Sequence, residues 1–210
     1  MIDLYTWSTP NGRKVSIALE ELGIAYAVHA VDITKGEQHD PDFIAISPNN
    51  RIPAIVDQEA GFSLMESGAI LLYLAEKAGR LMPEPGESYW HTMEWLMWQM
   101  GGLGPMLGQA HHFLKYNRGK SEYAEARYLT ETKRLYGVLD RRLTDNEYLV
   151  DEYSIADISV WPWVSRFEWQ TIDLDDYPQV KRWYMAIASR PAVQRGYNVP
   201  MFVNEIPLPD

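Results

Sequence analysis

Residues 2–31 read IDLYTWSTPNGRKVSIALEELGIAYAVHAV, and this stretch indicates the fold class. A short apolar segment at 2–7 leads into the turn STPNG, after which apolar residues recur at helical spacing from 15 to 22. Gly23 is placed to end that helix, and residues 26–31 form a second apolar segment. The pattern predicts a strand, a helix and another strand, which together make a βαβ unit.

The following residues extend this unit. The polar loop 32–42 is too long for a plain connector, so we expect it to carry function. Residues 47–56, SPNNRIPAIV, predict a turn that runs through a proline into a third strand. A fourth strand is predicted at 62–65, and apolar residues at helical spacing from 70 to 78 predict a closing helix. The first 78 residues therefore read as βαβ, a loop and ββα.

The second part of the chain has a helical pattern throughout. Residues 79–88 hold two prolines and two glycines, a composition typical of an interdomain linker. Ser154 and Asp157 have the spacing of a capping box at the start of one helix. We expect helices over 89–103, 105–116, 121–143, 154–169 and 177–188. The predicted domains are thus 1–78 and an all-helical domain with a C-terminal tail at 89–210, joined by the linker.

Composition limits the possible functions. The chain has 210 residues, a formal net charge of -10 and scattered basic residues, which disfavours nucleic acid as a partner. No uninterrupted apolar run is long enough to span a membrane, and the N-terminus lacks the pattern of an export signal. The absence of cysteine excludes protein-borne thiol chemistry and cysteine metal sites, and it suits the reducing cytoplasm. Thiol chemistry would need an external thiol.

Glu66 and Ser67 are the first candidate binding residues. They lie where a strand ends and a helix begins, so Ser67 and the first helical amides would face a small anion while Glu66 could hold an ammonium group. Together they could hold an amino-acid zwitterion. The same two residues are also typical of an ordinary serine cap beside an exposed glutamate.

Two further motifs allow a functional and a structural interpretation. Thr9 and Asn11 occupy the turn before the first helix, where their donors could stabilise a thiolate, although such residues also serve as ordinary N-caps. A cis peptide bond at Ile52-Pro53 would present backbone groups to an extended peptide, although trans bonds are far commoner. The pair His111-His112 does not suggest a metal site, because adjacent helical residues point about 100° apart.

Four features, taken in order, resemble the glutathione transferase superfamily over nearly the whole chain. They are the Thr-Pro-Asn turn, the Ile52-Pro53 strand entrance, Glu66-Ser67 and the capped helix at 154. The stretches 5–11, 47–57 and 101–109 look like the bacterial nu-class, the disulfide-bond oxidoreductases. This resemblance implies a thioredoxin-like N-terminal domain, an all-helical C-terminal domain and a homodimer.

The resemblance also implies a binding mode for glutathione as a cosubstrate, without a metal. Glu66 and Ser67 would hold the γ-glutamyl end, and the Ile52 backbone would pair with the cysteinyl part beside a cis Pro53. In most relatives a Tyr, Ser or Cys activates glutathione, but here Tyr5 lies within a strand. The nu-class pattern assigns thiolate stabilisation to Thr9 with Asn11, and Ser8 is an adjacent rival. Gln38 and, from a neighbouring subunit, Arg127 complete the set that the resemblance implies.

Three functions follow from these interpretations. We expect glutathione-dependent reduction of small disulfides, in which bound glutathione supplies the attacking thiolate. Conjugation of glutathione to an electrophile, or reduction of an organic hydroperoxide, would use the same binding residues. A non-catalytic binding or regulatory module is the third interpretation, and retention of Thr9, Asn11, Gln38, Glu66 and Ser67 argues against it.

Overall fold

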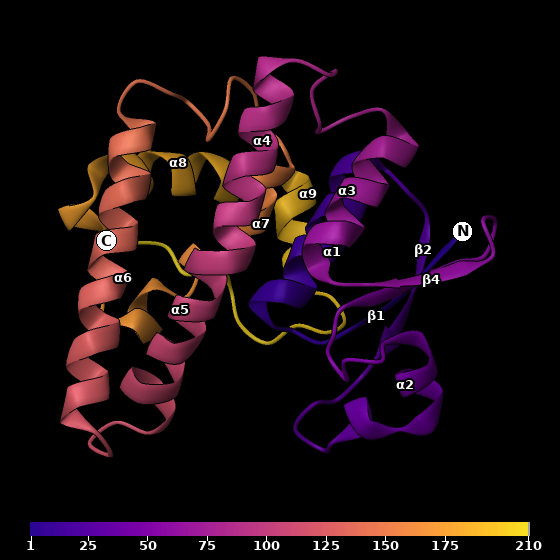
Figure 1. The fold of residues 1–210 in the computed structure, drawn as a ribbon, viewed down its shortest axis with the longest axis horizontal. Coiled ribbons are helices and arrows are strands. Elements are labelled where there is room, and N and C mark those ends of the chain that lie inside the picture. Colours follow the sequence, from indigo (N-terminus) through magenta and orange to yellow (C-terminus); the bar gives the residue numbers. More distant parts are fainter. Residues whose placement is uncertain (210) are drawn as a thin grey trace. The chain divides into compact units, whose positions relative to one another are not determined.

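The computed structural model of the chain describes residues 1–209 and divides into two units (Figure 1). Unit 1 comprises Met1–Met82 and Ser189–Ile206. Unit 2 comprises Pro83–Ala188 and residues 207–209. The division into domains 1–78 and 89–210 with a linker at 79–88 stays a prediction about how the chain folds.

Unit 1 contains a four-stranded mixed sheet with the strand order β2-β1-β3-β4. The strands are β1 (Ile2–Thr6), β2 (Tyr26–Ala30), β3 (Ala54–Asp57) and β4 (Phe62–Met65). β1 pairs in parallel with β2 and antiparallel with β3, and β3 pairs antiparallel with β4. The four predicted strands are therefore confirmed.

Helices cover both faces of this sheet. The helices of unit 1 are α1 (Pro10–Leu22), the 3-10 turn η1 (Glu37–His39), α2 (Pro41–Ile46), α3 (Ser67–Ala78) and α9 (Pro191–Tyr197). Figure 1 shows α1 and α3 on one side of the strands and α2 on the other. Along β1, Ile2 and Leu4 are fully buried, whereas Tyr5 points to the opposite face and packs against Phe43 of α2. The alternation in β1 thus gives the sheet two covered faces.

Three helical elements of unit 1, namely η1, α2 and α9, were not predicted from the sequence. The loop expected at 32–42 ends in η1 and the first residues of α2, which begins with proline at its first position, a place that proline favours. α9 lies in the segment expected to be a tail. It packs closely on α1, because a Cβ atom on Gly196 would lie 2.7 Å from the backbone of Ile17. Ser16 Oγ donates a hydrogen bond to Gly196 O over 2.6 Å at the same contact.

Every regular element of unit 2 that the structure describes is a helix, as predicted. Its elements are α4 (Glu87–Trp98), η2 (Gln99–Leu103), α5 (Gly104–Ala110), η3 (His111–Tyr116), α6 (Glu122–Leu143), α7 (Ile155–Val164), η4 (Phe167–Gln170), η5 (Leu174–Asp176) and α8 (Pro178–Ala188). η2 and η3 are π-helical turns that continue α4 and α5 without a break. The helix predicted at 154–169 is too long, since α7 ends at Val164 and a separate 3-10 turn begins at Phe167.

The capping box at the start of α7 is confirmed. The Asp157 carboxylate accepts hydrogen bonds from Ser154 N at 3.0 Å, Leu149 N at 3.0 Å and Trp183 Nε1 at 2.8 Å. Burial raises the pKa of Asp157 to about 6, and the hydrogen bonds oppose that shift. This carboxylate therefore joins α7, α8 and the preceding loop within unit 2. In the part of the chain that the structure describes, no helix has the length and apolar character needed to cross a bilayer.

Candidate functional site

The strand register brings three chain segments to one end of the sheet. Tyr5 of β1 lies opposite Ala54 of β3, and Ala54 lies opposite Met65 of β4. β1 and β4 therefore end where β3 begins. Three segments therefore lie at this same end of the sheet: the turn after β1, the proline before β3 and the Glu66-Ser67 pair after β4. At this end of unit 1, α1 and α3 both present their N-termini.

The turn before α1 positions Thr9 and Asn11. Thr9 is the N-cap of α1, and its Oγ1 accepts a hydrogen bond from Gly12 N at 3.2 Å. A Cβ atom on Gly12 would lie 2.2 Å from Trp7 O, so this turn requires glycine there. Asn11 is half-buried in the first helical turn. The hydroxyl hydrogen of Thr9 is not used by the cap, so capping and donation to a ligand are compatible in one side chain.

Ser8, the rival to Thr9, has a different contact. Its Oγ donates a hydrogen bond to Met201 O over 3.3 Å, within unit 1. That contact directs the Ser8 hydroxyl hydrogen toward the chain segment after α9. The geometry favours Thr9 over Ser8 as a donor to a ligand.

The start of α3 combines an exposed carboxylate with a buried hydroxyl. Glu66 is the N-cap residue, with a φ of 72°, a left-handed conformation that is uncommon for glutamate. Ser67 is the first helical residue and is 3% exposed. Lys14 Nζ of α1 donates a hydrogen bond to Ser67 Oγ over 3.3 Å. Ser67 is therefore not the helix cap that the sequence pattern allowed, and its oxygen accepts a hydrogen bond from a buried lysine that has no signature in the sequence.

The remaining predicted residues of unit 1 follow β2 and precede β3. The Ile52-Pro53 peptide bond is cis, as expected. Gln38 lies in η1, and its Oε1 is buried with no hydrogen-bond partner among residues 1–209. Because β2 runs parallel to β1, the segment that leads to Gln38 leaves the sheet at the same end as the Thr9 turn. A buried amide oxygen without a hydrogen-bond partner lowers the stability of the folded chain. This position therefore suits a residue that accepts a hydrogen bond from a ligand.

Arg127 lies in unit 2, so the structure does not bring it into the unit that holds the other predicted residues. It is exposed on α6 and lines a cavity of about 560 Å³ with Met106, Tyr123 and Glu131. The sequence offers no local signal for a role of this arginine, which rested on resemblance alone.

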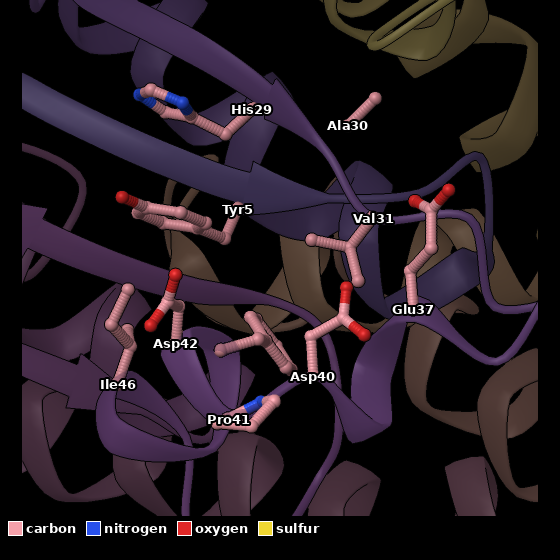
Figure 2. Close-up of a pocket in the computed structure, with 10 residues that line it drawn as sticks. Tyr5, His29, Ala30, Val31, Glu37, Asp40, Pro41, Asp42 and Ile46 are labelled. Carbon is pink, nitrogen blue, oxygen red and sulfur yellow. The ribbon is translucent and has the colours of Figure 1, made fainter.

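A second cavity, of about 480 Å³, lies in unit 1 between the sheet and α2 (Figure 2). Figure 2 shows Tyr5 beside His29 at one wall, and their rings stack with centroids 4.6 Å apart. Glu37, Asp40 and Asp42 also line it. Among the described residues, the cavity lining includes none of the predicted glutathione contacts. Its carboxylates would repel an anionic tripeptide, so we do not assign glutathione to it.

His111 is a core residue of unit 2. Its ring stacks on Trp163 with centroids 5.6 Å apart, and its Nε2 is 3.0 Å from Gln170 Nε2. Burial, and secondarily Arg166, lowers the pKa of His111 to about 4, so the ring is neutral at pH 7 and can accept from Gln170. Within residues 1–209, no group of three or more His, Asp or Glu side chains is arranged to hold a metal.

A thioredoxin-like sheet with helix N-termini converging at one end, followed by an all-helical unit, defines the class of glutathione transferase-like proteins. Sequence comparison agrees. Residues 1–76 match the glutathione S-transferase N-terminal domain, and residues 100–191 match the glutathione S-transferase C-terminal domain. The chain belongs to the glutathione S-transferase family.

Two proteins with similar sequences are disulfide-bond oxidoreductases by name. The chain is 52% identical to disulfide-bond oxidoreductase YfcG of Escherichia coli over 198 residues, which cover 91% of this chain and 92% of the relative. It is 39% identical to disulfide-bond oxidoreductase YghU of the same organism, over 93% of this chain and 73% of the relative.

Solved structures of glutathione transferases have the same fold as this chain. A glutathione transferase from Pseudomonas putida, solved with one glutathione disulfide per subunit, superposes with a TM-score of 0.89 at 43% identity. The superposition covers 95% of this chain and 91% of that chain. A glutathione transferase from Burkholderia graminis, with two glutathione molecules per subunit, gives the same TM-score and identity over 95% and 88% of the two chains. The predicted fold is confirmed.

Proposed function

We propose that the protein is a glutathione-dependent disulfide-bond oxidoreductase of the nu-class. The observation that carries this proposal is the convergence of the Thr9 turn, Pro53 and Glu66-Ser67 at one end of the sheet in a chain without cysteine. The names of YfcG and YghU support the reaction class, and the solved relatives with glutathione or glutathione disulfide support the ligand.

The proposed binding mode is an extended tripeptide across this end of unit 1. Ser67 and the first amides of α3 receive the α-carboxylate of the γ-glutamyl group, because a helix N-terminus attracts anions. The Glu66 carboxylate receives the ammonium group. The Ile52 backbone pairs with the cysteinyl residue, and the buried oxygen of Gln38 accepts an N–H group of the tripeptide. Arg127 of a second subunit approaches the same ligand.

Thr9 and Asn11 act at the sulfur. A hydroxyl and an amide donor at the positive end of α1 favour the thiolate over the thiol. The thiolate attacks one sulfur of a small disulfide RSSR, so that a glutathione–SR mixed disulfide forms and RS⁻ leaves. A second glutathione thiolate attacks this mixed disulfide at the glutathione sulfur, which gives glutathione disulfide and a second RS⁻. Two glutathione molecules are oxidised as one disulfide is reduced, and each RS⁻ takes up a proton lost by a glutathione thiol.

We further propose a cytoplasmic homodimer. The complete absence of cysteine suits a reducing compartment. Unit 2 exposes large side chains that a partner subunit would cover, with Trp90 66% exposed on α4 and Tyr123 78% exposed on α6. Sedimentation of a monomer at micromolar concentration would contradict the dimer.

Calorimetric titration with glutathione and with glutathione disulfide tests the site. We expect both to bind the wild-type protein. Glu66→Gln keeps the shape of the side chain and removes the charge that faces the ammonium group, so it should weaken both by roughly tenfold or more, as expected for a charge-assisted contact. Equal affinity in wild type and Glu66→Gln would contradict the proposed site.

A further inference from the structure

Arg166 is a buried cation of unit 2 that the proposed reaction does not use. It precedes η4 and is only 7% exposed. Its Nε is buried and has no hydrogen-bond partner among residues 1–209. Within the same residues its guanidinium forms no ion pair, and Glu168 of η4 is exposed. Buried charges in proteins are ordinarily paired, because desolvation without a partner is unfavourable. Arg166 therefore has donor capacity that the described part of the chain does not use.

The local backbone explains the position of this guanidinium. Arg166 is the N-cap of the 3-10 turn η4, and Trp169 N donates to Arg166 O over 2.9 Å. Residues three apart in a 3-10 turn lie one above the other. The Arg166 Cζ accordingly lies 4.3 Å from the centre of the Trp169 ring. The ring face attracts the positive charge, but it does not replace an oxygen acceptor for the N–H groups.

A second element brings another cation to the same ring. The π-helical turn η3 packs against η4, and Lys115 Nζ lies 5.5 Å from the centre of the Trp169 ring. Tyr116 of η3 contacts Trp169 edge to face with ring centroids 5.7 Å apart, and it is 65% exposed. Two cations thus share one indole ring in a chain whose formal net charge is -10. Their mutual repulsion would be relieved by an anion between them.

The neighbouring His111 reports the sign of the local charge. Its ring lies edge to face with Trp169, with centroids 5.6 Å apart. Burial, and secondarily the charge of Arg166, lowers the pKa of His111, and no carboxylate among residues 1–209 opposes that shift. The environment of these rings is therefore positive without a compensating acidic side chain.

We propose that Arg166, Lys115 and Trp169 form a binding site for a ligand that carries a carboxylate. The planar guanidinium matches a carboxylate and can donate two parallel hydrogen bonds to it. Lys115 supplies a second positive charge from the exposed side. Trp169 and Tyr116 offer aromatic surface to the apolar part of the ligand. The site lies within unit 2 and does not depend on the glutathione contacts proposed in unit 1.

Calorimetric titration with three small probes tests the ligand class. Benzoate carries a carboxylate on an aromatic ring, benzamide has nearly the same shape without the charge, and inorganic phosphate has charge without a ring. We expect benzoate to bind, and benzamide to bind at least roughly tenfold more weakly. Phosphate should also bind more weakly than benzoate, because it makes no contact with the rings. Tighter binding of benzamide or phosphate than of benzoate would overturn the assignment, as would the absence of benzoate binding up to roughly 10 mM.

Variants test the residues. Arg166→Met should weaken benzoate binding by roughly 10–100-fold, as expected for lost charge-assisted hydrogen bonds, and Lys115→Met by roughly 3–10-fold, because Lys115 is exposed. Arg141→Met is the control, since it removes an exposed arginine in the last turn of α6 and causes the same change in net charge. It should leave the Kd unchanged. Equal Kd values in wild type and Arg166→Met would overturn the inference, and so would equal weakening by Arg141→Met.

A direct readout separates ligand contact from a merely structural role of Arg166. In protein labelled with ¹⁵N-arginine, the Nε–H resonance of Arg166 is identified by its loss in Arg166→Lys. It should shift when benzoate is added to the wild type, whereas the Nε–H resonance of Arg141 should not. A resonance of Arg166 that stays in place at saturating benzoate would overturn the site. Should Arg166→Met fail to fold, Arg166→Lys keeps the charge, loses the planar fork and should weaken benzoate binding roughly tenfold.

Discussion

Replacing Thr9 by valine removes one hydroxyl at nearly constant shape and tests its two roles together. Thr9 Oγ1 caps α1 by accepting from Gly12 N at 3.2 Å, and its hydrogen is the proposed donor to the glutathione sulfur. Loss of the cap should lower the free energy of unfolding by about 1 kcal/mol. Loss of the donor should remove roughly 1.5–3 kcal/mol of thiolate stabilisation, which raises the pKa of the bound thiol by about one to two units.

The assay is a titration of thiolate absorbance with glutathione at saturation. Wild type and Thr9→Val should give curves displaced by that difference in pKa. The Kd of glutathione should change little, because the proposed binding mode assigns the other parts of the ligand to Glu66, Ser67 and Gln38. Thr9→Ser is the matched control, since it keeps the hydroxyl and should restore both the curve and the cap. Superimposable curves for wild type and Thr9→Val would show that the Thr9 hydroxyl does not stabilise the thiolate and would transfer the role to Asn11 or Ser8.

Three further predictions concern stability. Gly196→Ala should lower the unfolding free energy by about 1–3 kcal/mol in urea titration, because the new methyl group meets the backbone of Ile17, and an unchanged midpoint would contradict that close packing. Asp157→Ala should cost about 3 kcal/mol or more in thermal unfolding, since three buried N–H donors lose their acceptor, whereas Asp157→Asn, which keeps an acceptor, should cost less. The depressed pKa of His111, about 4, means that the unfolded state binds a proton that the native state excludes as pH falls from about 6.5 to 4. Wild type should therefore lose about 3 kcal/mol more than His111→Gln over that range, and parallel pH profiles would refute the assignment.

Much of unit 1 could be predicted because its signals are local. The strand–turn–helix pattern of 2–31 and the turn before α3 depend on alternation, glycine stops and caps that lie close together in sequence. α9 was missed for the opposite reason. Its place depends on Gly196 meeting Ile17, a contact between residues far apart in the chain that no local pattern records.

In the candidate site, too, residues with a local sequence signature could be predicted, and residues placed by packing could not. Thr9, Glu66 and Ser67 were identified because helix starts have a sequence signature. Lys14 was missed, because a charged residue beside Arg13 in a helix reads as a surface position, and only the packing of α1 shows that both are buried. Arg127 belongs to unit 2, and the role proposed for it requires a second subunit, which no local sequence pattern records.

We expect this cysteine-free chain to use bound glutathione to reduce disulfides. Parallel turnover tests it most directly: purified protein and glutathione are offered a small disulfide, an aryl halide and an organic hydroperoxide, and kcat/KM is measured for each. We expect the largest value for the disulfide, with glutathione disulfide as the product and a marked loss of rate in Thr9→Val. A larger value for the aryl halide or the hydroperoxide would rule out disulfide reduction as the main activity and would identify the protein as a transferase or a peroxidase.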